Sequence, residues 1–265
     1  MDKTPRISIT IIGHNEGYHL SELLPTLDWA DEIIYVDCKS DDDSLRIAQA
    51  AGCLVFQKPN NPNLNVNKDF AMKQAGSDWL FYLDPDERIP AELAAEIRSR
   101  VSSPDKYQAF SLNRRNHYFG KWLKHGSQYP DTQLRLFRKE SAQFPLKHVH
   151  EKLQVDGPVG KLKNDMHHHP YLNISQYLQK FDFYTSFEAN YLSARGERPS
   201  PGMSFHYWIS QPALRFVRRY FFKQGFLDGW QGFFAALFDS LNFMVRYFKL
   251  IEITRQQAKD EQKQI

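Results

Sequence analysis

Short apolar runs that alternate with helical patterns constrain the fold of this chain more than any other feature. Four such runs lie at residues 7–12, 33–36, 54–56 and 79–83. Between the first two, leucines repeat with the i, i+3, i+4, i+7 spacing of a buried helix face, at positions 20, 23, 24 and 27. Strands that alternate with helices build a mostly parallel sheet with helices on both faces. The sequence therefore predicts an α/β fold, with further helices over about residues 44–51, 66–75, 90–101 and 175–194.

Polar residues follow three of these strands at the point where each apolar run ends. Asn15-Glu16 follow the first, Asp37 ends the second, and Asp84-Pro85-Asp86 follow the fourth. Because ligands bind at the carboxyl ends of parallel strands, we expect these side chains to share one edge of the sheet. Two carboxylates spaced i, i+2 can hold a hard divalent cation, which prefers oxygen ligands. The alternative is a surface turn, in which Asp and Pro are common.

Charge is distributed unevenly along the 265 residues. Residues 1–104 carry 10 lysines and arginines against 17 acidic residues, and the remainder carries 24 against 14. An acidic first part suits a metal site, and a basic second part suits a surface that meets anions. Uneven surface charge without a partner is the alternative. Neither a Walker loop nor a G-x-G-x-x-G motif is present, so the standard phosphate-cradling loops are not expected.

The amino-terminal sequence and the two cysteines indicate a protein of the cytoplasm. The first six residues lack the apolar segment of a signal peptide, and Cys38 and Cys53 do not make a disulfide framework. The sequence contains no stretch of 18 uncharged apolar residues, so we expect no membrane-spanning helix. We expect a cytoplasmic location, with peripheral attachment at the inner face of the membrane as an open alternative.

The last part of the chain has an aromatic helical pattern of its own. Apolar residues recur every three or four positions, at Phe226, Trp230, Phe233, Leu237, Leu241, Met244 and Phe248. Arg215, Arg219 and Lys223 precede them with i, i+4, i+8 spacing. Basic residues beside bulky aromatics are typical of a helix on an anionic membrane surface. Packing of the same aromatics on the main domain or on a second copy in a homo-oligomer is the alternative.

The motifs taken together resemble the GT-A fold glycosyltransferases of family 2. The resemblance is carried by Asn15-Glu16, by Asp37-x-x-Ser40-x-Asp42 and by Asp84-x-Asp86-Glu87. Later stretches resemble the lipopolysaccharide core β-glucosyltransferase branch, at residues 134–138, 149–151 and 160–162. The resemblance covers about residues 5–200. It implies a GT-A nucleotide-sugar domain over residues 1–200, and the aromatic helical pattern predicts an amphipathic helical extension over residues 201–265.

The resemblance also implies roles for individual residues. Nucleotide-sugar contacts are expected from Asn15, Glu16, Asp37, Ser40, Lys68 and Asp84. A metal site for Mg²⁺ or Mn²⁺ is expected from Asp86, Asp84 and His168, with His167 or His169 as alternatives to His168. Glu151, in the Val-His-Glu stretch, is expected to be the catalytic base, with Asp131 second. For both acids a salt bridge is the alternative.

The implied activity is inverting, metal-dependent transfer of a hexose, first of all glucose, from a UDP-sugar. The acceptor would be a saccharide or glycolipid such as the lipopolysaccharide inner core, and nucleic acid is not expected as a partner. A metal ion would neutralise the charge of the leaving diphosphate, and a carboxylate would take the proton of the acceptor hydroxyl. The alternatives are the same fold acting on a lipid phosphate or a peptide, and a non-catalytic nucleotide-binding scaffold.

Overall fold

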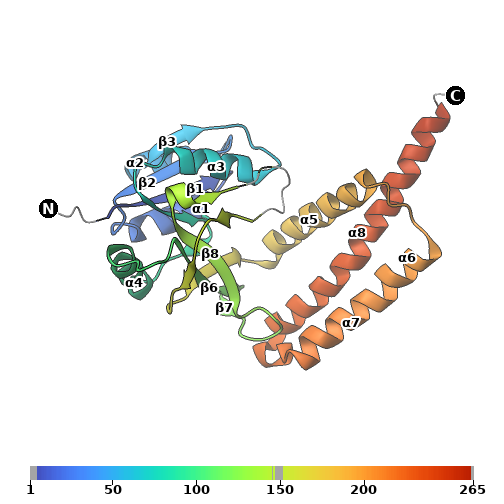
Figure 1. Ribbon diagram of the computed structural model, residues 1–265. Coiled ribbons are helices and arrows are strands. Elements are labelled where there is room, and N and C mark those ends of the chain that lie inside the picture. The colour runs from blue at the N-terminus through green and yellow to red at the C-terminus, as the bar shows by residue number, and fades with distance from the viewer. Residues whose placement is uncertain (1–4, 145, 147–151, 264–265) are drawn as a thin grey trace. The chain divides into compact units, whose positions relative to one another are not determined.

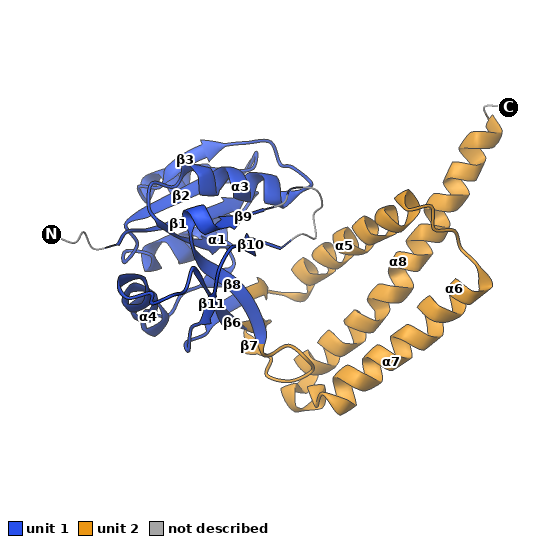
Figure 2. Ribbon diagram, viewed as in Figure 1, with its two compact units in different colours: residues 1–114, 131–168 blue, residues 115–130, 169–265 orange. Residues whose placement is uncertain are grey.

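The computed structural model describes residues 5–144, 146 and 152–263, and it divides the chain into two compact units (Figure 2). Unit 1 comprises residues 1–114 and 131–168, and unit 2 comprises residues 115–130 and 169–265. Strands β6 and β12 each contain a boundary between the units. The predicted domain boundary at residue 200 stays a prediction, because compactness does not define which segments fold independently.

Unit 1 is built on a sheet whose first part is parallel (Figure 1). Its strands lie in the order β3-β2-β1-β4, and their bounds are β1 Ile7–Gly13, β2 Glu32–Asp37, β3 Leu54–Gln57 and β4 Trp79–Leu83. All seven residues of β1 and all five of β4 are buried. Strands covered on both faces read as continuous apolar runs, and this explains why the sequence identifies them.

The later strands add an antiparallel part. β8 (Asp131–Arg138) pairs antiparallel with β4 on one side and with β6 (Ala109–Tyr118) on the other. β5 (Glu87–Arg88) pairs antiparallel with the residues His167 and His168 of β12 (Met166–Tyr171). The remaining short strands are β7 Lys121–Trp122, β9 Ala142–Gln143, β10 Gln154–Val155 and β11 Val159–Lys161. The sheet is therefore mixed but mostly parallel in its first half, as expected.

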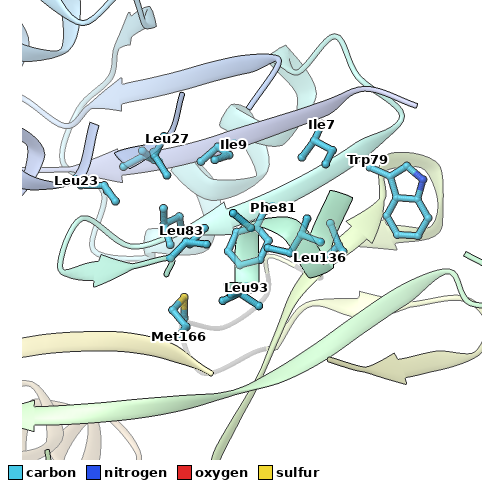
Figure 3. Packing of buried hydrophobic residues seen from close by; sticks show 14 of the residues in the cluster. Ile7, Ile9, Leu23, Leu27, Trp79, Phe81, Leu83, Leu93, Leu136 and Met166 are labelled. Atoms are coloured by element: carbon cyan, nitrogen blue, oxygen red, sulfur yellow. The ribbon is translucent and has the colours of Figure 1, made fainter. Parts of the chain in front are cut away.

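Helices cover both faces of this sheet. Leu20, Ala48 and Leu93 belong to a core on one face with Ile9 and Phe81, so α1 (Gly17–Leu23), α2 (Ser44–Ala50) and α4 (Ala91–Ser102) lie there. Figure 3 shows Ile9, Phe81 and Leu93 of this core. The other face is covered by α3 (Leu64–Gln74), whose buried residues pack with alternate residues of the same strands. Short 3₁₀ turns lie at η1 Leu24–Thr26 and η2 Lys139–Ser141. The predicted two-faced α/β architecture is confirmed.

The strand register brings three strand ends to one edge. Gly13 of β1 is level with Asp37 of β2, and Ile11 of β1 is level with Leu83 of β4. The Cys38 N–H donates to the Gly13 carbonyl over 2.8 Å, so the β2 strand end is held against β1. Residues that follow β1, β2 and β4 therefore begin at the same sheet edge, as the sequence predicted.

Unit 2 is helical. α5 (Ile174–Ala194) and α7 (Gln211–Val217) both pack along the long helix α8 (Gly229–Lys263). Shorter segments complete it: α6 Pro201–Phe205, π-helical turns η3 His206–Ser210 and η4 Arg218–Phe222, and the 3₁₀ turn η5 Gly225–Asp228. Tyr177 of α5 packs edge-on against Phe234 and Phe238 of α8, with ring centroids 4.9 and 5.3 Å away. The predicted aromatic helical extension is present.

Two of the basic residues that precede the aromatic stripe have a partner within unit 2. Arg215 and Arg219 both form ion pairs with Asp239 of α8, at 2.7 and 2.6 Å. Their charges therefore serve to hold α7 and η4 against α8. Among the described residues, none of the helices combines the length and the apolar character that crossing a membrane requires.

Candidate active site

The loops that follow β1 and β2 are bound to each other. Asn15 has a left-handed backbone (φ 57°), a conformation that Asn tolerates better than most residues. Its N–H donates to Ser40 Oγ over 2.9 Å, and its side-chain oxygen accepts the Asp41 N–H over 2.9 Å. Asp37 is buried, and its carboxylate accepts the Ser40 N–H over 3.2 Å. One hydrogen-bond network therefore joins three residues that are predicted to contact the nucleotide, Asn15, Asp37 and Ser40.

Asp42 fixes the beginnings of two helices. Its carboxylate accepts the Gly17 N–H at the start of α1 and the Ser44 N–H at the start of α2, over 3.0 and 2.9 Å. Burial raises the pKa of Asp42, but these hydrogen bonds outweigh burial and lower it. Ser44 Oγ also accepts the N–H of Glu16, over 2.8 Å, and Glu16 is half-buried at this position. The loop after β1 is thus tied to α2.

Asp84, which follows β4, lies among cations. Arg135 Nη2 donates to its Oδ2 over 2.9 Å, Lys68 Nζ lies 3.8 Å from its Oδ1, and the Tyr82 hydroxyl also donates to Oδ1. Burial raises the pKa of Asp84, but Lys68 and Arg135 outweigh it and bring the pKa below its ordinary value. Both cations also lie over the Tyr82 ring, at 4.2 and 4.3 Å. Asp84 is therefore a charged, firmly held carboxylate.

Glu87 is a central residue of this cluster that the sequence analysis quoted without a role. Its side chain is fully buried, and its Oε1 accepts from Arg135 over 2.6 Å and from Arg114 over 3.1 Å. Its Oε2 accepts the Asp84 N–H over 2.9 Å. Burial lowers the pKa of Arg135, but Glu87 and Asp84 raise it well above its ordinary value. The available signal was an Asp-x-Asp-Glu stretch together with arginines in later strands.

Asp131, the second candidate for the catalytic base, forms a salt bridge. Arg114 lies opposite it in the β6–β8 pairing, and the Nε and Nη2 atoms of Arg114 are each 2.9 Å from its Oδ2. Its other oxygen accepts from Gln133 over 2.7 Å. A carboxylate that is paired with a guanidinium is a weaker base, so this geometry favours the salt-bridge interpretation of Asp131. Glu151, the first candidate, lies outside the described residues.

Asp86 lies beside an imidazole. Its Oδ2 is 3.5 Å from Nε2 of His168, and both side chains are mostly buried. His168 is level with Glu87 in the β5–β12 pairing, which places the histidine beside the loop that carries Asp86. His167 and His169 point to the opposite face of β12 from His168, because side chains alternate along a strand. His169 stacks on His117, with ring centroids 4.7 Å apart.

The Asp86 and His168 pair fits a shared divalent cation. Two ligands that each lie about 2.1 Å from one ion are about 3–4 Å apart, and the observed 3.5 Å falls in this range. Oxygen and imidazole nitrogen are ligands that Mn²⁺ accepts. Asp84 is surrounded by Lys68 and Arg135, which repel a cation, so the metal role predicted for Asp84 stays a prediction.

Comparisons with known proteins identify the class. The model of the family described as "Glycosyl transferase family 2" matches residues 8–154, which is more than half of the chain. The chain therefore belongs to glycosyl transferase family 2 and is a glycosyltransferase.

Two curated relatives match most of the chain. "Lipopolysaccharide core biosynthesis glycosyltransferase LpsC" of Rhizobium meliloti is 26% identical over 238 residues, which are 87% of this chain and 86% of the relative. "Uncharacterized glycosyltransferase RT0209" of Rickettsia typhi is 26% identical over 261 residues, which are 94% of this chain and 88% of the relative. The chain is therefore similar to these glycosyltransferases over almost its whole length.

A solved structure shares the fold. "Mannosyltransferase PcManGT from Pyrobaculum calidifontis in complex with GDP-Man and Mn2+" is similar with a TM-score of 0.54 and 10% identity, over 94% of this chain and 88% of that chain. At this identity the likeness shows the fold alone. The predicted resemblance to the GT-A glycosyltransferases of family 2 is confirmed.

Proposed function

We propose that this protein is a metal-dependent, inverting hexosyltransferase that uses a UDP-sugar, with glucose as the first candidate for the sugar. The acceptor we propose is a saccharide or glycolipid such as the lipopolysaccharide inner core. The observation that carries the proposal is the Asp86–His168 pair beside a cluster of paired charges at the sheet edge. The relative named for lipopolysaccharide core biosynthesis and the fold neighbour solved with a nucleotide sugar and Mn²⁺ support the substrate class.

The residues at the sheet edge divide the work of binding in this proposal. Asp86 and His168 would hold Mg²⁺ or Mn²⁺, which when bound supplies positive charge to the leaving diphosphate. Asp37 and the joined loops at Asn15 and Ser40 would receive the nucleoside, because they are hydrogen-bonded into one rigid rim. A rim that is ordered before binding loses little conformational entropy when the donor arrives.

Asp84 would act through position in the proposed mechanism. Its N–H is held by Glu87 and its carboxylate by Arg135, so the Pro85 turn that carries Asp86 leaves β4 in one fixed direction. Lys68, 3.8 Å from Asp84, lies at the position predicted for a nucleotide contact. Burial lowers the pKa of Lys68 despite the opposing effect of Asp84.

Inversion requires a base on the acceptor side of the sugar. A carboxylate must accept the proton of the acceptor hydroxyl while that oxygen attacks the anomeric carbon and the diphosphate leaves. Since Asp131 is bound to Arg114, we assign this role to Glu151, on the match of its Val-His-Glu stretch. One displacement converts an α-linked donor to a β-linked product.

The test is donor turnover by the full-length protein. Release of UDP from UDP-glucose is measured with Mn²⁺ and with a chelator, for the wild type, for Asp86→Ala and for the exposed control Asp28→Ala. We expect turnover that depends on the metal, is reduced at least a hundredfold in Asp86→Ala and is unchanged in Asp28→Ala. Full activity of a folded Asp86→Ala variant would refute the metal assignment. In a separate experiment, a panel of acceptors tested with the wild type distinguishes a saccharide from a lipid phosphate or a peptide.

A further inference from the structure

Unit 2 contains a basic pocket that the proposed reaction does not use. It has a volume of about 530 Å³ and lies between the loop at residues 124–130 and the turn that follows η4. Lys124, His125, Ser127, Tyr129, Phe222 and Lys223 are among the residues that line it. We call it the basic pocket.

The two loops that form the basic pocket are bound firmly to each other. The Gly126 N–H donates to the Lys223 carbonyl over 2.7 Å, and Arg219 Nε donates to the Gly126 carbonyl over 2.9 Å. The buried Asp228 accepts from the backbone N–H of His125 over 2.7 Å and pairs with its Nδ1 over 3.0 Å. The walls of the pocket are therefore fixed before any ligand arrives.

Backbone strain is concentrated in the same two loops. Ser127 and Gln224, one in each loop, have left-handed backbones with φ of 63° and 56°. Such a conformation is costly for a residue other than glycine and persists only where the surroundings hold it. Strained residues cluster at ligand sites, so two of them facing one pocket point to a binding function.

The lining chemistry selects an anion. Lys124 and Lys223 carry ammonium groups, and Ser127 and Tyr129 carry hydroxyls. Both oxygens of Asp228 are hydrogen-bonded to His125, so this carboxylate orients the imidazole. The Lys124 ammonium lies over the Trp122 ring, 4.6 Å from its centroid. Ammonium and hydroxyl groups in the lining of one pocket are donors from which a phosphate group can accept.

Exposed apolar side chains surround the turn that carries Lys223. Phe221 and Phe222 precede it and Phe226 and Leu227 follow it, with 56, 78, 46 and 54% of their surfaces exposed. A site for free phosphate does not require exposed apolar side chains around it. An interface for another protein is typically poor in lysine at its centre. Aromatic residues that flank lysines are typical of segments that lie in an anionic membrane surface.

We propose that the basic pocket binds the phosphate of an anionic lipid headgroup, while Phe222 and its apolar neighbours enter the acyl region of the same membrane. This inference rests on the proposed function for its biological role, which is to hold the enzyme where a glycolipid acceptor lies. The binding itself needs no nucleotide sugar, so it can be tested separately.

The test is flotation of the full chain with vesicles of phosphatidylcholine, alone or with a quarter of phosphatidylglycerol. We expect binding to the anionic vesicles only. The double variant Lys124→Gln/Lys223→Gln should weaken it about 30-fold, from about 1 kcal/mol for each lysine near the surface. Phe222→Ser should weaken it about tenfold or more.

Matched controls change charge and apolar surface elsewhere. Lys106→Gln/Lys163→Gln removes two exposed lysines of unit 1, and Phe183→Ser removes a side chain of α5 that is 64% exposed. Both should bind as the wild type does, and circular dichroism should show all variants folded. Equal loss of binding in the controls would overturn the assignment to the pocket.

Two other results would overturn the inference. Equal binding to neutral vesicles would exclude recognition of an anionic headgroup. Calorimetric binding of inorganic phosphate without vesicle binding would show that the pocket is a site for a soluble anion. If the wild type turns over UDP-glucose but does not bind anionic vesicles, only this inference fails. If it binds vesicles without turnover, the proposed function fails instead.

Discussion

Replacing Glu87 by glutamine tests whether the paired charges behind β4 organise the site. Glu87→Gln keeps the shape of the side chain and removes its charge. Arg135 and Arg114 then lose the negative charge of the buried carboxylate to which they donate over 2.6 and 3.1 Å. With the amide oxygen toward the arginines, the amide NH₂ faces the Asp84 N–H, so a donor meets a donor.

The expected loss of folding stability is large because the side chain of Glu87 is fully buried and no water can replace its lost interactions. Breaking a buried ion pair by removing one partner costs about 3–5 kcal/mol, and an unsatisfied buried N–H contributes about 1–3 kcal/mol of such a loss. The arginines keep Asp84 and Asp131 as partners, which favours the lower part of the range. For a chain of this size about 3 kcal/mol lowers Tm by about 6–12 °C.

The assay is thermal unfolding followed by circular dichroism, together with UDP-glucose turnover. Glu140→Gln is the control, because Glu140 is an exposed glutamate of η2 in the same unit. We expect Glu87→Gln to lose stability and turnover together and Glu140→Gln to lose neither. A change in Tm below about 2 °C for Glu87→Gln would show that the stability of this cluster does not depend on the charge of Glu87.

Two further predictions concern titration and reactivity. Burial raises the pKa of Asp84, but Lys68 and Arg135 bring it below the ordinary value. The stability that this charge contributes is therefore present above about pH 4 and is lost as pH falls through the folded-state pKa. The free energy of unfolding should fall less steeply with decreasing pH in Asp84→Asn than in the wild type, and identical slopes would contradict this. Burial raises the pKa of the Cys53 thiol to about 11, so iodoacetamide at pH 8 should modify Cys53 about a hundredfold more slowly than a free cysteine, as mass spectrometry of the peptides can measure. Alkylation of Cys53 in the folded protein at the rate of a free thiol would contradict it.

The sequence predicts the parallel part of the fold because short stretches of consecutive residues identify its strands and helices. β1 and β4 are continuous apolar runs since both of their faces are covered, and polar residues mark their ends. α3 begins at Leu64, two residues before the start predicted at about residue 66, because the Asn63 side chain accepts the Asn65 N–H and caps the helix.

The antiparallel additions and the charge cluster could not be predicted in the same way. β12 contains three successive histidines and a proline, which give no strand signal, and its pairing with β5 places His168 beside Asp86. Glu87 meets arginines that come from two distant strands, so its role depends on tertiary pairing. The metal-ligand role of His168 came from the resemblance, and the geometry supplies a physical reason for it.

Calorimetric titration of UDP into the protein, with and without Mn²⁺, tests whether the strand ends form one site for a cation and for the diphosphate that the cation neutralises. We predict UDP binding that requires Mn²⁺ in the wild type, is lost in Asp86→Ala and is kept in Asp28→Ala. UDP binding of equal strength without Mn²⁺, or in a folded Asp86→Ala variant, would contradict it.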